Sequence, residues 1–243
     1  MSPYKRQARL AGQEFDKAHH VNTERDRLSE WAADIDSPNW AAGTGYSAAL
    51  PENVRASIRA LAIAHEDYTA IDIGSGKGRV LLVASEFAFN ELLGVEYAPD
   101  LHEIALQNIA AYHSDKQRCH NIKSVCADAV TFSLPEAPLV LFFHHPFGGS
   151  TLEKFLQGVQ RSLKSHPRNI KVIYGDPIDG ELFEKAGFQK IGSKALRKST
   201  VFRKFVLRHV GWFPIVGNNN QQGMEYVIYD NVVNNGDRPV MPT

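Results

Sequence analysis

Short apolar runs alternate with stretches of helical periodicity along most of the chain. The apolar runs, at residues 69–74, 92–96, 122–127, 139–143 and 171–175, predict strands. Between them, apolar residues recur at the spacing of one helix face, which predicts helices at 79–87, 99–112, 150–163 and 181–186. The run at 139–143 is apolar throughout, as expected of a central parallel strand buried on both faces. The alternation predicts an α/β fold whose mostly parallel sheet carries helices on both faces.

Helix start and stop signals support these boundaries. Ser150 and Glu153 have the spacing of a capping box, Pro51 stands at the first position of a helix before the first strand, and Gly187 follows the helix at 181–186. Thr23 is expected to cap a helix that contains Leu28 and Trp31.

The two ends of the chain are less regular. Residues 1–22 have no strong period, and residues 36–46 are loop-like in composition. Further strand candidates lie at 188–191, 201–210 and 226–229, and the sequence leaves open which two of them form an antiparallel pair at the end of the sheet. We expect an N-terminal helical segment at 1–50 and one large domain at 51–243 with a C-terminal extension.

A glycine turn follows the first strand. Gly74, Gly76 and Gly78 alternate with Ser75 and Lys77, directly before the predicted helix at 79–87. Alternating glycines let the backbone turn sharply and bring its N–H groups close to a ligand at the start of a helix. The second strand ends on Glu96, 22 residues after the first glycine, where a nucleotide-binding βαβ unit places the acceptor for two ribose hydroxyls.

The spacing of the glycines distinguishes two ligand classes. A dinucleotide fingerprint has the pattern G-x-G-x-x-G and would place its third glycine at position 79, where this chain has Arg79. The dinucleotide pattern also gives no role to Asp72, the carboxylate just before the turn. A glycine turn of another α/β nucleotide-binding protein is the alternative interpretation.

The segment from Asp72 to Gly78, together with Gly94-Val-Glu96, resembles the first two motifs of class I S-adenosylmethionine-dependent methyltransferases, D-x-G-x-G-x-G and a second strand that ends in an acidic residue. The resemblance implies a Rossmann-like seven-stranded sheet with an antiparallel last strand, an N-terminal lid over the cofactor, and S-adenosylmethionine as the methyl donor, with S-adenosylhomocysteine as product. It implies a cofactor site made of Asp72, Gly74, Ser75, Gly76, Gly78, Glu96, Tyr97, Asp128, Ala129 and His144.

Asp128 follows the third strand, at the sheet edge where ligands bind. The resemblance implies that its carboxylate accepts a hydrogen bond from the exocyclic amine of adenine. The alternative is that Asp128 forms an Asx turn as the chain leaves the strand.

The chain also resembles an uncharacterised bacterial group of these enzymes that shares D-x-G-S-G-K-G-R, G-V-E, an N-terminal F-D-x-x-x-G-V-D-T and an N-P-F after the fourth strand. The corresponding residues here begin at Asp72, Gly94, Phe15 and His145, so the similarity spans residues 15–190. This chain departs from the group at His20, which stands in place of a glycine, and at His145, which stands in place of an asparagine.

The segment after the fourth strand is where the resemblance places the chemistry. It keeps Pro146 and Phe147 but has a histidine nitrogen where amino-group methyltransferases have a side-chain oxygen. His145 is predicted to accept a proton from an N–H or O–H nucleophile, because the pKa of histidine lies near working pH. A histidine that only supports the end of the strand is the alternative. Tyr46 and Phe147 are the candidate walls of the acceptor pocket.

Composition narrows the remaining choices. Apolar residues make up 43% and charged residues 22%, which is typical of globular proteins. Lys plus Arg and Asp plus Glu number 27 each, so nucleic acid is an unlikely partner, although residues 185–208 carry eight Lys and Arg and no acid. Cys119 and Cys126 do not have the spacing of a metal site, and no metal is expected.

We expect a cytoplasmic protein, because no apolar run is long enough to span a membrane and the first residues lack the features of a signal peptide. The expected form is a monomer or weak dimer that acts on a small molecule or a protein. The predicted activity is methyl transfer to an N or O nucleophile. The alternatives are a cofactor-binding protein without transferase activity and an NAD-type oxidoreductase.

Overall fold

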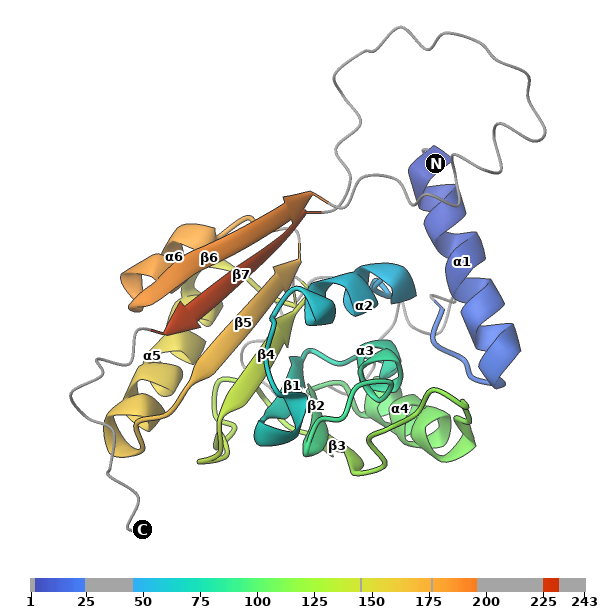
Figure 1. Ribbon diagram of the computed structural model, residues 1–243, viewed down its shortest axis with the longest axis horizontal. Helices are drawn as coiled ribbons and strands as arrows, with labels where there is room; N and C mark the ends of the chain where they lie inside the picture. Colours follow the sequence, from blue (N-terminus) through green and yellow to red (C-terminus); the bar gives the residue numbers. More distant parts are fainter. Residues whose placement is uncertain (1–2, 25–45, 145, 176, 196–224, 232–243) are drawn as a thin grey trace, which may run out of the picture.

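A seven-stranded sheet forms the centre of the protein (Figure 1). The computed structural model describes residues 3–24, 46–144, 146–175, 177–195 and 225–231. The strands are β1 (Thr69–Ile73), β2 (Glu91–Glu96), β3 (Ile122–Cys126), β4 (Leu139–Phe143), β5 (Ile170–Gly175), β6 (Phe188–Ala195) and β7 (Glu225–Asn231). The helices are α1 (Pro3–His19), α2 (Pro51–Arg59), α3 (Arg79–Ala84), α4 (Pro99–Ala111), α5 (Gly149–Ser165) and α6 (Gly180–Lys185), and a 3₁₀ turn, η3, spans His65–Asp67.

The strand order is β3-β2-β1-β4-β5-β7-β6. The first five strands in this order are parallel, and β1 pairs with β2 on one side and β4 on the other, with Thr69 opposite both Glu91 and Leu139. From β1 the chain adds β2 and β3 on one side and then crosses back to add β4 on the other side of β1. The carboxyl ends of β1 and β4 lie side by side at this switch point, which is where open α/β sheets bind ligands.

The last two strands complete the sheet in antiparallel fashion. β7 inserts between β5 and β6 and is antiparallel to both. Residues 226–229 of β7 are all buried, whereas β6 at the edge exposes Ile191 and carries an irregularity between Lys190 and Gly192. The candidates at 188–191 and 226–229 are thus the antiparallel pair, and the predicted sheet is confirmed. The candidate at 201–210 lies outside the described residues.

Apolar side chains form one cluster on each face of the sheet. On one face, Val54 and Ile58 of α2 and the apolar residues of α3 pack against the sheet. On the other face, Phe155 of α5 and Phe183 of α6 do so. The alternation of side chains along a strand explains the division, since Ala70 of β1 joins the first cluster and its neighbour Ile71 the second. Helices therefore cover both faces, as predicted. No helix of the described ranges is long and apolar enough to cross a bilayer.

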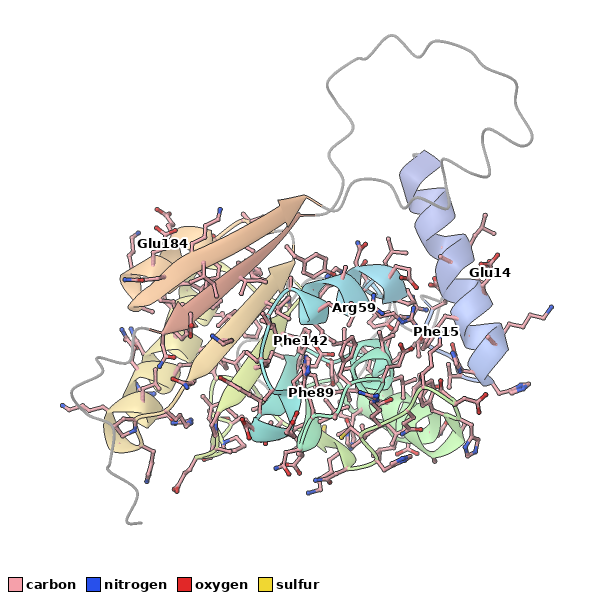
Figure 2. All side chains as sticks on the ribbon, in the orientation of Figure 1. Glu14, Phe15, Arg59, Phe89, Phe142 and Glu184 are labelled. Carbon is pink, nitrogen blue, oxygen red and sulfur yellow. The ribbon has the colours of Figure 1, made fainter. Side chains whose placement is uncertain are left out.

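A 17-residue helix, α1, occupies part of the region predicted to lack a period. Its inner face is Gly12, Phe15, Asp16 and His19, at the spacing of one helix face. Only Phe15 in this set is strongly apolar, which is why periodicity missed the helix. Figure 2 shows Phe15 on the side of α1 toward the body of the protein and Glu14 away from it. The predicted helix after Thr23 falls on residues 25–45, outside the described residues, and the predicted boundary at residue 50 stays a prediction.

His20 follows α1 with a φ of 55°. This is the left-handed conformation that commonly ends a helix and that favours glycine. The position at which this chain departs from the glycine of the resembling group is therefore one where the backbone uses a glycine-like conformation.

The capping box at Ser150 is wrong. α5 begins at Gly149, with Gly148 at the cap position, so Ser150 lies inside the first turn. The backbone N–H of Gly149 instead donates to Oδ2 of Asp179 at 3.1 Å. A carboxylate from the segment after β5 thus satisfies the start of α5 and neutralises part of its dipole. The predicted helix at 79–87 is also shorter, since α3 ends at Ala84.

The cap of α5 gives a first test. Asp179→Ala should lower the free energy of unfolding by about 1 kcal/mol, because a cap and a favourable charge at a helix N-terminus are lost. Ser150→Ala should change it by less than about 0.5 kcal/mol, because Ser150 is exposed and caps nothing. Urea unfolding of both variants checks this. The reverse order of effects would restore the capping box.

Candidate active site at the glycine turn

The turn between β1 and α3 depends on its three glycines. Gly74, Gly76 and Gly78 have φ values of 74°, 51° and 84°, in the left-handed region where other residues are strained. The N–H groups of Gly74 and Ser75 both donate to the carbonyl of Val95, at 2.9 and 3.1 Å. The end of β2 thus fixes the turn.

Two predicted site residues lie directly on this turn. Pro146 contacts Gly74, and the ring of Tyr46 contacts Gly76, so closely that a Cβ on either glycine would overlap them. The phenol of Tyr46 donates to the carbonyl of Thr23 at 2.6 Å, and its burial raises the pKa of that phenol. The structure therefore brings together the glycine turn, the segment after β4 and the segment before α2.

Glu96 reaches the turn from the end of β2. Its Oε2 accepts a hydrogen bond from the Gly76 N–H at 2.7 Å, and its Oε1 accepts one from the Ala98 N–H at 2.9 Å. Burial raises the pKa of this carboxyl, and the backbone N–H groups of Ala98, Gly76 and Tyr97 oppose that rise. The predicted ribose acceptor is thus buried beside the second glycine.

Asp72 is the second buried carboxyl, at 3% exposure. Its burial, and next the negative charge of Glu96, raise the pKa of Asp72 to about 8. Within the described residues, no cation pairs with either carboxyl. Ionising either carboxyl is therefore costly in the cofactor-free protein, so an anionic ligand at this turn is disfavoured, whereas a cationic ligand is favoured because it would stabilise the ionised carboxylates.

The other predicted cofactor residues lie around the same edge. The Oγ of Ser75 is buried without a hydrogen-bond partner in the described parts of the chain. His144 follows β4, and its Nδ1 lies 3.0 Å from where a Cβ on Gly175 would stand. Oδ1 of Asp128 accepts from the N–H of Val130 at 2.9 Å, which is the Asx turn given above as the alternative to adenine binding, and Ala129 is buried in the core. The cofactor role of these residues stays a prediction.

The predicted acceptor side is described only in part. His145 lies outside the described residues. The ring of Phe147 is 9% exposed and packs edge-on against Phe143, with centroids 6.3 Å apart, and against Phe155 at 6.1 Å. Most of this ring therefore belongs to the core. The catalytic role of both residues stays a prediction.

Sequence reasoning missed three buried polar residues behind the turn. Lys77 is 0% exposed and donates from Nζ to the carbonyl of Glu24 at 2.9 Å. The amide of Asn108 on α4 donates to the carbonyls of both Lys77 and Asn22 at 2.9 Å. Arg79 is 2% exposed among acidic and hydroxyl groups of the N-terminal segment. The sequence shows a motif at the glycine turn and another in the N-terminal segment, but nothing in the spacing of the two motifs indicates that they contact each other.

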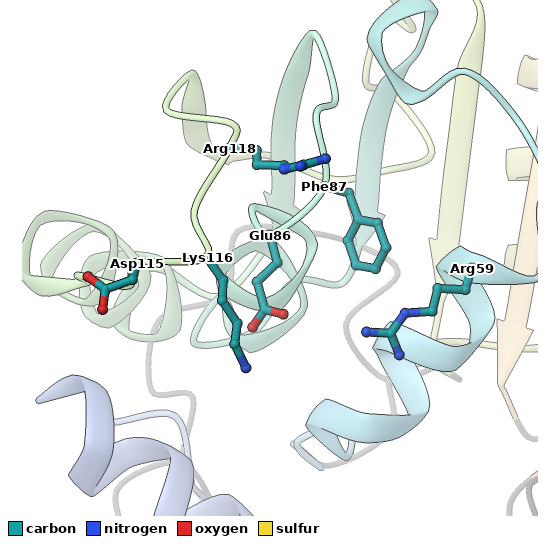
Figure 3. Close-up of a pocket in the computed structure, with 6 residues that line it drawn as sticks. All are labelled: Arg59, Glu86, Phe87, Asp115, Lys116 and Arg118. Atoms are coloured by element: carbon teal, nitrogen blue, oxygen red, sulfur yellow. The ribbon is translucent and has the colours of Figure 1, made fainter.

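A separate surface pocket of about 360 Å³ lies away from the turn (Figure 3). It is lined by Arg59, Glu86, Phe87, Asp115, Lys116 and Arg118. Arg59 is the last residue of α2, and the other lining residues follow the ends of α3 and α4, whereas the glycine turn lies at the start of α3. The pocket contains no predicted site residue, so we do not assign it to the candidate site. The described residues contain no group of side chains that could hold a metal ion.

Comparison with solved structures identifies the fold. The chain is similar to a putative RNA methyltransferase from Pyrococcus horikoshii, with a TM-score of 0.51 and 12% identity, over 96% of this chain and 100% of that one. It is also similar to a putative S-adenosylmethionine-dependent methyltransferase from Listeria monocytogenes, with a TM-score of 0.50 and 8% identity, over 75% and 98% of the two chains. No protein-family model and no curated protein matches the chain. The chain thus has the Rossmann-like methyltransferase fold.

The raised pKa of Asp72 predicts a pH-dependent stability. Between about pH 4 and pH 8 the folded protein keeps a proton on Asp72 that the unfolded chain has released, so the free energy of unfolding falls as pH rises through this range. Asp72→Asn cannot ionise and should be more stable than the wild type at pH 8, by about 5 kcal/mol for a pKa raised to about 8 in the folded protein, and nearly equal to it at pH 4.

Urea unfolding of the cofactor-free protein at several pH values measures this difference. Asp100→Asn, in the exposed first turn of α4, is the matched control and should leave the pH profile unchanged. A profile of Asp72→Asn that runs parallel to the wild type would show that Asp72 is ionised in the folded protein.

Proposed function

We propose that this protein transfers a methyl group from S-adenosylmethionine to an N or O nucleophile of an acceptor not yet identified. The observation that carries the proposal is the pair of buried, uncompensated carboxyls, Asp72 and Glu96, on a left-handed glycine turn at the switch point. S-adenosylmethionine brings a sulfonium and an ammonium cation against a single carboxylate, and this net positive charge suits a turn with two buried carboxyls. The pyrophosphate of NAD would bring negative charge to the same turn, without a compensating cation there.

The residues present fit this cofactor. Glu96 would accept the two ribose hydroxyls with the lone pairs that Gly76 and Ala98 leave available. The buried Oγ of Ser75 offers an unused hydrogen-bonding group beside the turn. Asp128 and Ala129 would lie toward adenine, and Tyr97 and His144 would complete the walls. When bound, the sulfonium supplies an electrophilic methyl group.

Methyl transfer from a sulfonium is an in-line displacement, so the protein has chiefly to position the nucleophile and exclude water. The bond from the nucleophile to the methyl carbon forms as the carbon–sulfur bond breaks, and S-adenosylhomocysteine leaves. The proton of the nucleophile passes to a base, for which His145 is our candidate. Pro146 and Tyr46, both in contact with the glycine turn, and Phe147 would line the acceptor side.

Binding of the cofactor gives the direct test. Calorimetry should detect binding of S-adenosylmethionine and S-adenosylhomocysteine and none of NAD. Glu96→Ala should weaken this binding by about 10- to 150-fold, because charged hydrogen bonds of about 1.5–3 kcal/mol are lost. Glu91→Ala, at the other end of β2 and paired with Lys123 at the surface, is the matched control. Equal affinities of the two variants would remove the ribose assignment, and binding of NAD alone would favour an oxidoreductase.

Turnover separates a transferase from a protein that only binds the cofactor. Once an acceptor is known, His145→Ala should lower turnover by about 10²–10⁴ with cofactor affinity nearly unchanged. The wild-type rate should rise with pH through a group near 6 to 7, since only the neutral imidazole accepts a proton. An equally active His145→Asn with no pH dependence in this range would leave the residue a supporting role.

A further inference from the structure

Hydrogen bonds to the carboxylate of Asp16 fold the chain back on itself between α1 and Glu24. Asp16, at the end of α1, accepts hydrogen bonds from the N–H groups of Thr23 and Glu24, both at 2.8 Å, and from the Thr23 hydroxyl. The left-handed His20 folds the chain back so that these groups meet. Residues 20–24 thus form a compact return from α1, which we call the N-terminal strap.

Arg79 joins this strap to the start of α3. Its Nε donates to Oγ1 of Thr23 at 2.6 Å, its Nη1 pairs with Glu24 at 2.8 Å, and its Nη2 lies 3.4 Å from Asp16. The guanidinium also lies 5.8 Å from the centroid of the Phe15 ring. A buried arginine is costly without such partners, so undocking of the strap would leave a buried charge unpaired.

The backbone of α1 is shaped to admit this ion pair. Gly12 lies in the buried face of the helix, and a Cβ on Gly12 would overlap the carboxylate of Glu24 and stand 2.6 Å from Nη1 of Arg79. Glycine is otherwise unfavourable in the middle of a helix. Its presence here lets the Glu24–Arg79 pair pack directly against α1.

Three further contacts connect the strap to the turn itself. Lys77 donates to the carbonyl of Glu24, and Asn108 bridges the carbonyls of Lys77 and Asn22. The hydroxyl of Tyr46 donates to the carbonyl of Thr23 while its ring lies on Gly76. The strap therefore contacts the side chain of Lys77, the Lys77 carbonyl through the Asn108 amide, and the aromatic ring that covers Gly76.

We propose that docking of α1 and the N-terminal strap is thermodynamically coupled to cofactor binding at the glycine turn, with Arg79 as the positioning residue that links them. The inference rests on the proposed function, because it names residues that act on the same cofactor site without touching the cofactor. Coupling is reciprocal: if the docked strap favours the binding-competent turn, a ligand on the turn favours the docked strap.

Hydrogen exchange on the wild-type protein measures this coupling. Saturating S-adenosylhomocysteine should slow amide exchange of residues 9–19 of α1 by about tenfold or more. Amides of α5, which packs on the other face of the sheet, are the internal reference for a general gain in stability and should change less. Bound ligand without added protection of α1 would overturn the inference and leave the proposed function intact. Absence of any binding would instead contradict the proposed function.

Gly12→Ala distinguishes an α1 that is only structural from an α1 that is coupled to the cofactor site, because the two predict opposite changes in the stability of the helix. On helix propensity alone, alanine should stabilise the helix and leave affinity unchanged. The new Cβ would displace the Glu24 carboxylate from its place beside Arg79, so if the strap is coupled to the site, α1 should exchange faster and the affinity for S-adenosylhomocysteine should fall by about tenfold. Unchanged affinity would overturn the inference.

Two comparisons control for a general loss of stability. Thr23→Val removes the hydroxyl that Arg79 binds and should weaken S-adenosylhomocysteine binding by about fivefold or more, whereas Thr23→Ser keeps it and should restore the wild-type affinity. Glu86→Gln disrupts another largely buried ion pair, with Arg55 at 2.6 Å, at the far end of α3 in the pocket of Figure 3. It should change affinity by less than about twofold. An equal loss of affinity in Glu86→Gln and Thr23→Val would show that both act only through the stability of the fold, and it would overturn the inference.

Discussion

The left-handed glycine turn at the end of β1 is the constraint on which the rest of the structure depends. Three residues with positive φ are needed to leave a fully buried strand and enter α3 within five residues. The hydrogen bonds from Gly74 and Ser75 to Val95 then fix the turn to β2. Because β1 lies between β2 and β4, this turn stands where the strand order reverses, next to the segment that follows β4. The candidate site is therefore a consequence of one local backbone geometry placed by the sheet.

Charge is divided sharply around this turn. Asp72 in β1 and Glu96 at the end of β2 are buried without a cationic partner in the described residues, whereas Lys77 and Arg79 are buried and bind the N-terminal segment. The two cations therefore do not pair with the two carboxyls, although Asp72 is only a few residues away from Lys77 and Arg79 in the chain. This separation leaves two buried carboxyls whose ionised forms a cationic ligand would stabilise, and it gives the N-terminal segment its attachment. The single motif at residues 72–79 thus contains a carboxyl at the candidate cofactor site and two cations that hold the N-terminal segment.

The elements that the sequence predicts well are those whose signal is local. Apolar runs such as 139–143 predict buried strands because parallel strands in the middle of a sheet must be apolar on both faces, and the glycine pattern predicts the turn because few other residues tolerate its φ values. α1 escaped prediction because only Phe15 on its inner face is strongly apolar, and this face becomes buried through Arg79 and Tyr112, more than fifty residues away. The cap of α5 failed for the same reason, since Asp179 comes from a different loop. The position of β7 between β5 and β6 is also set by tertiary packing, and no local sequence pattern predicts it.

The central claim is that the glycine turn binds S-adenosylmethionine or its product through Glu96. A crystal structure of the protein with S-adenosylhomocysteine tests it most directly. We predict that the two ribose hydroxyls lie within hydrogen-bond distance of the Glu96 carboxylate and that the thioether end points toward the segment after β4, with the adenine on the side of Asp128. A ligand bound elsewhere on the molecule, or a ribose placed away from Glu96, would contradict the account.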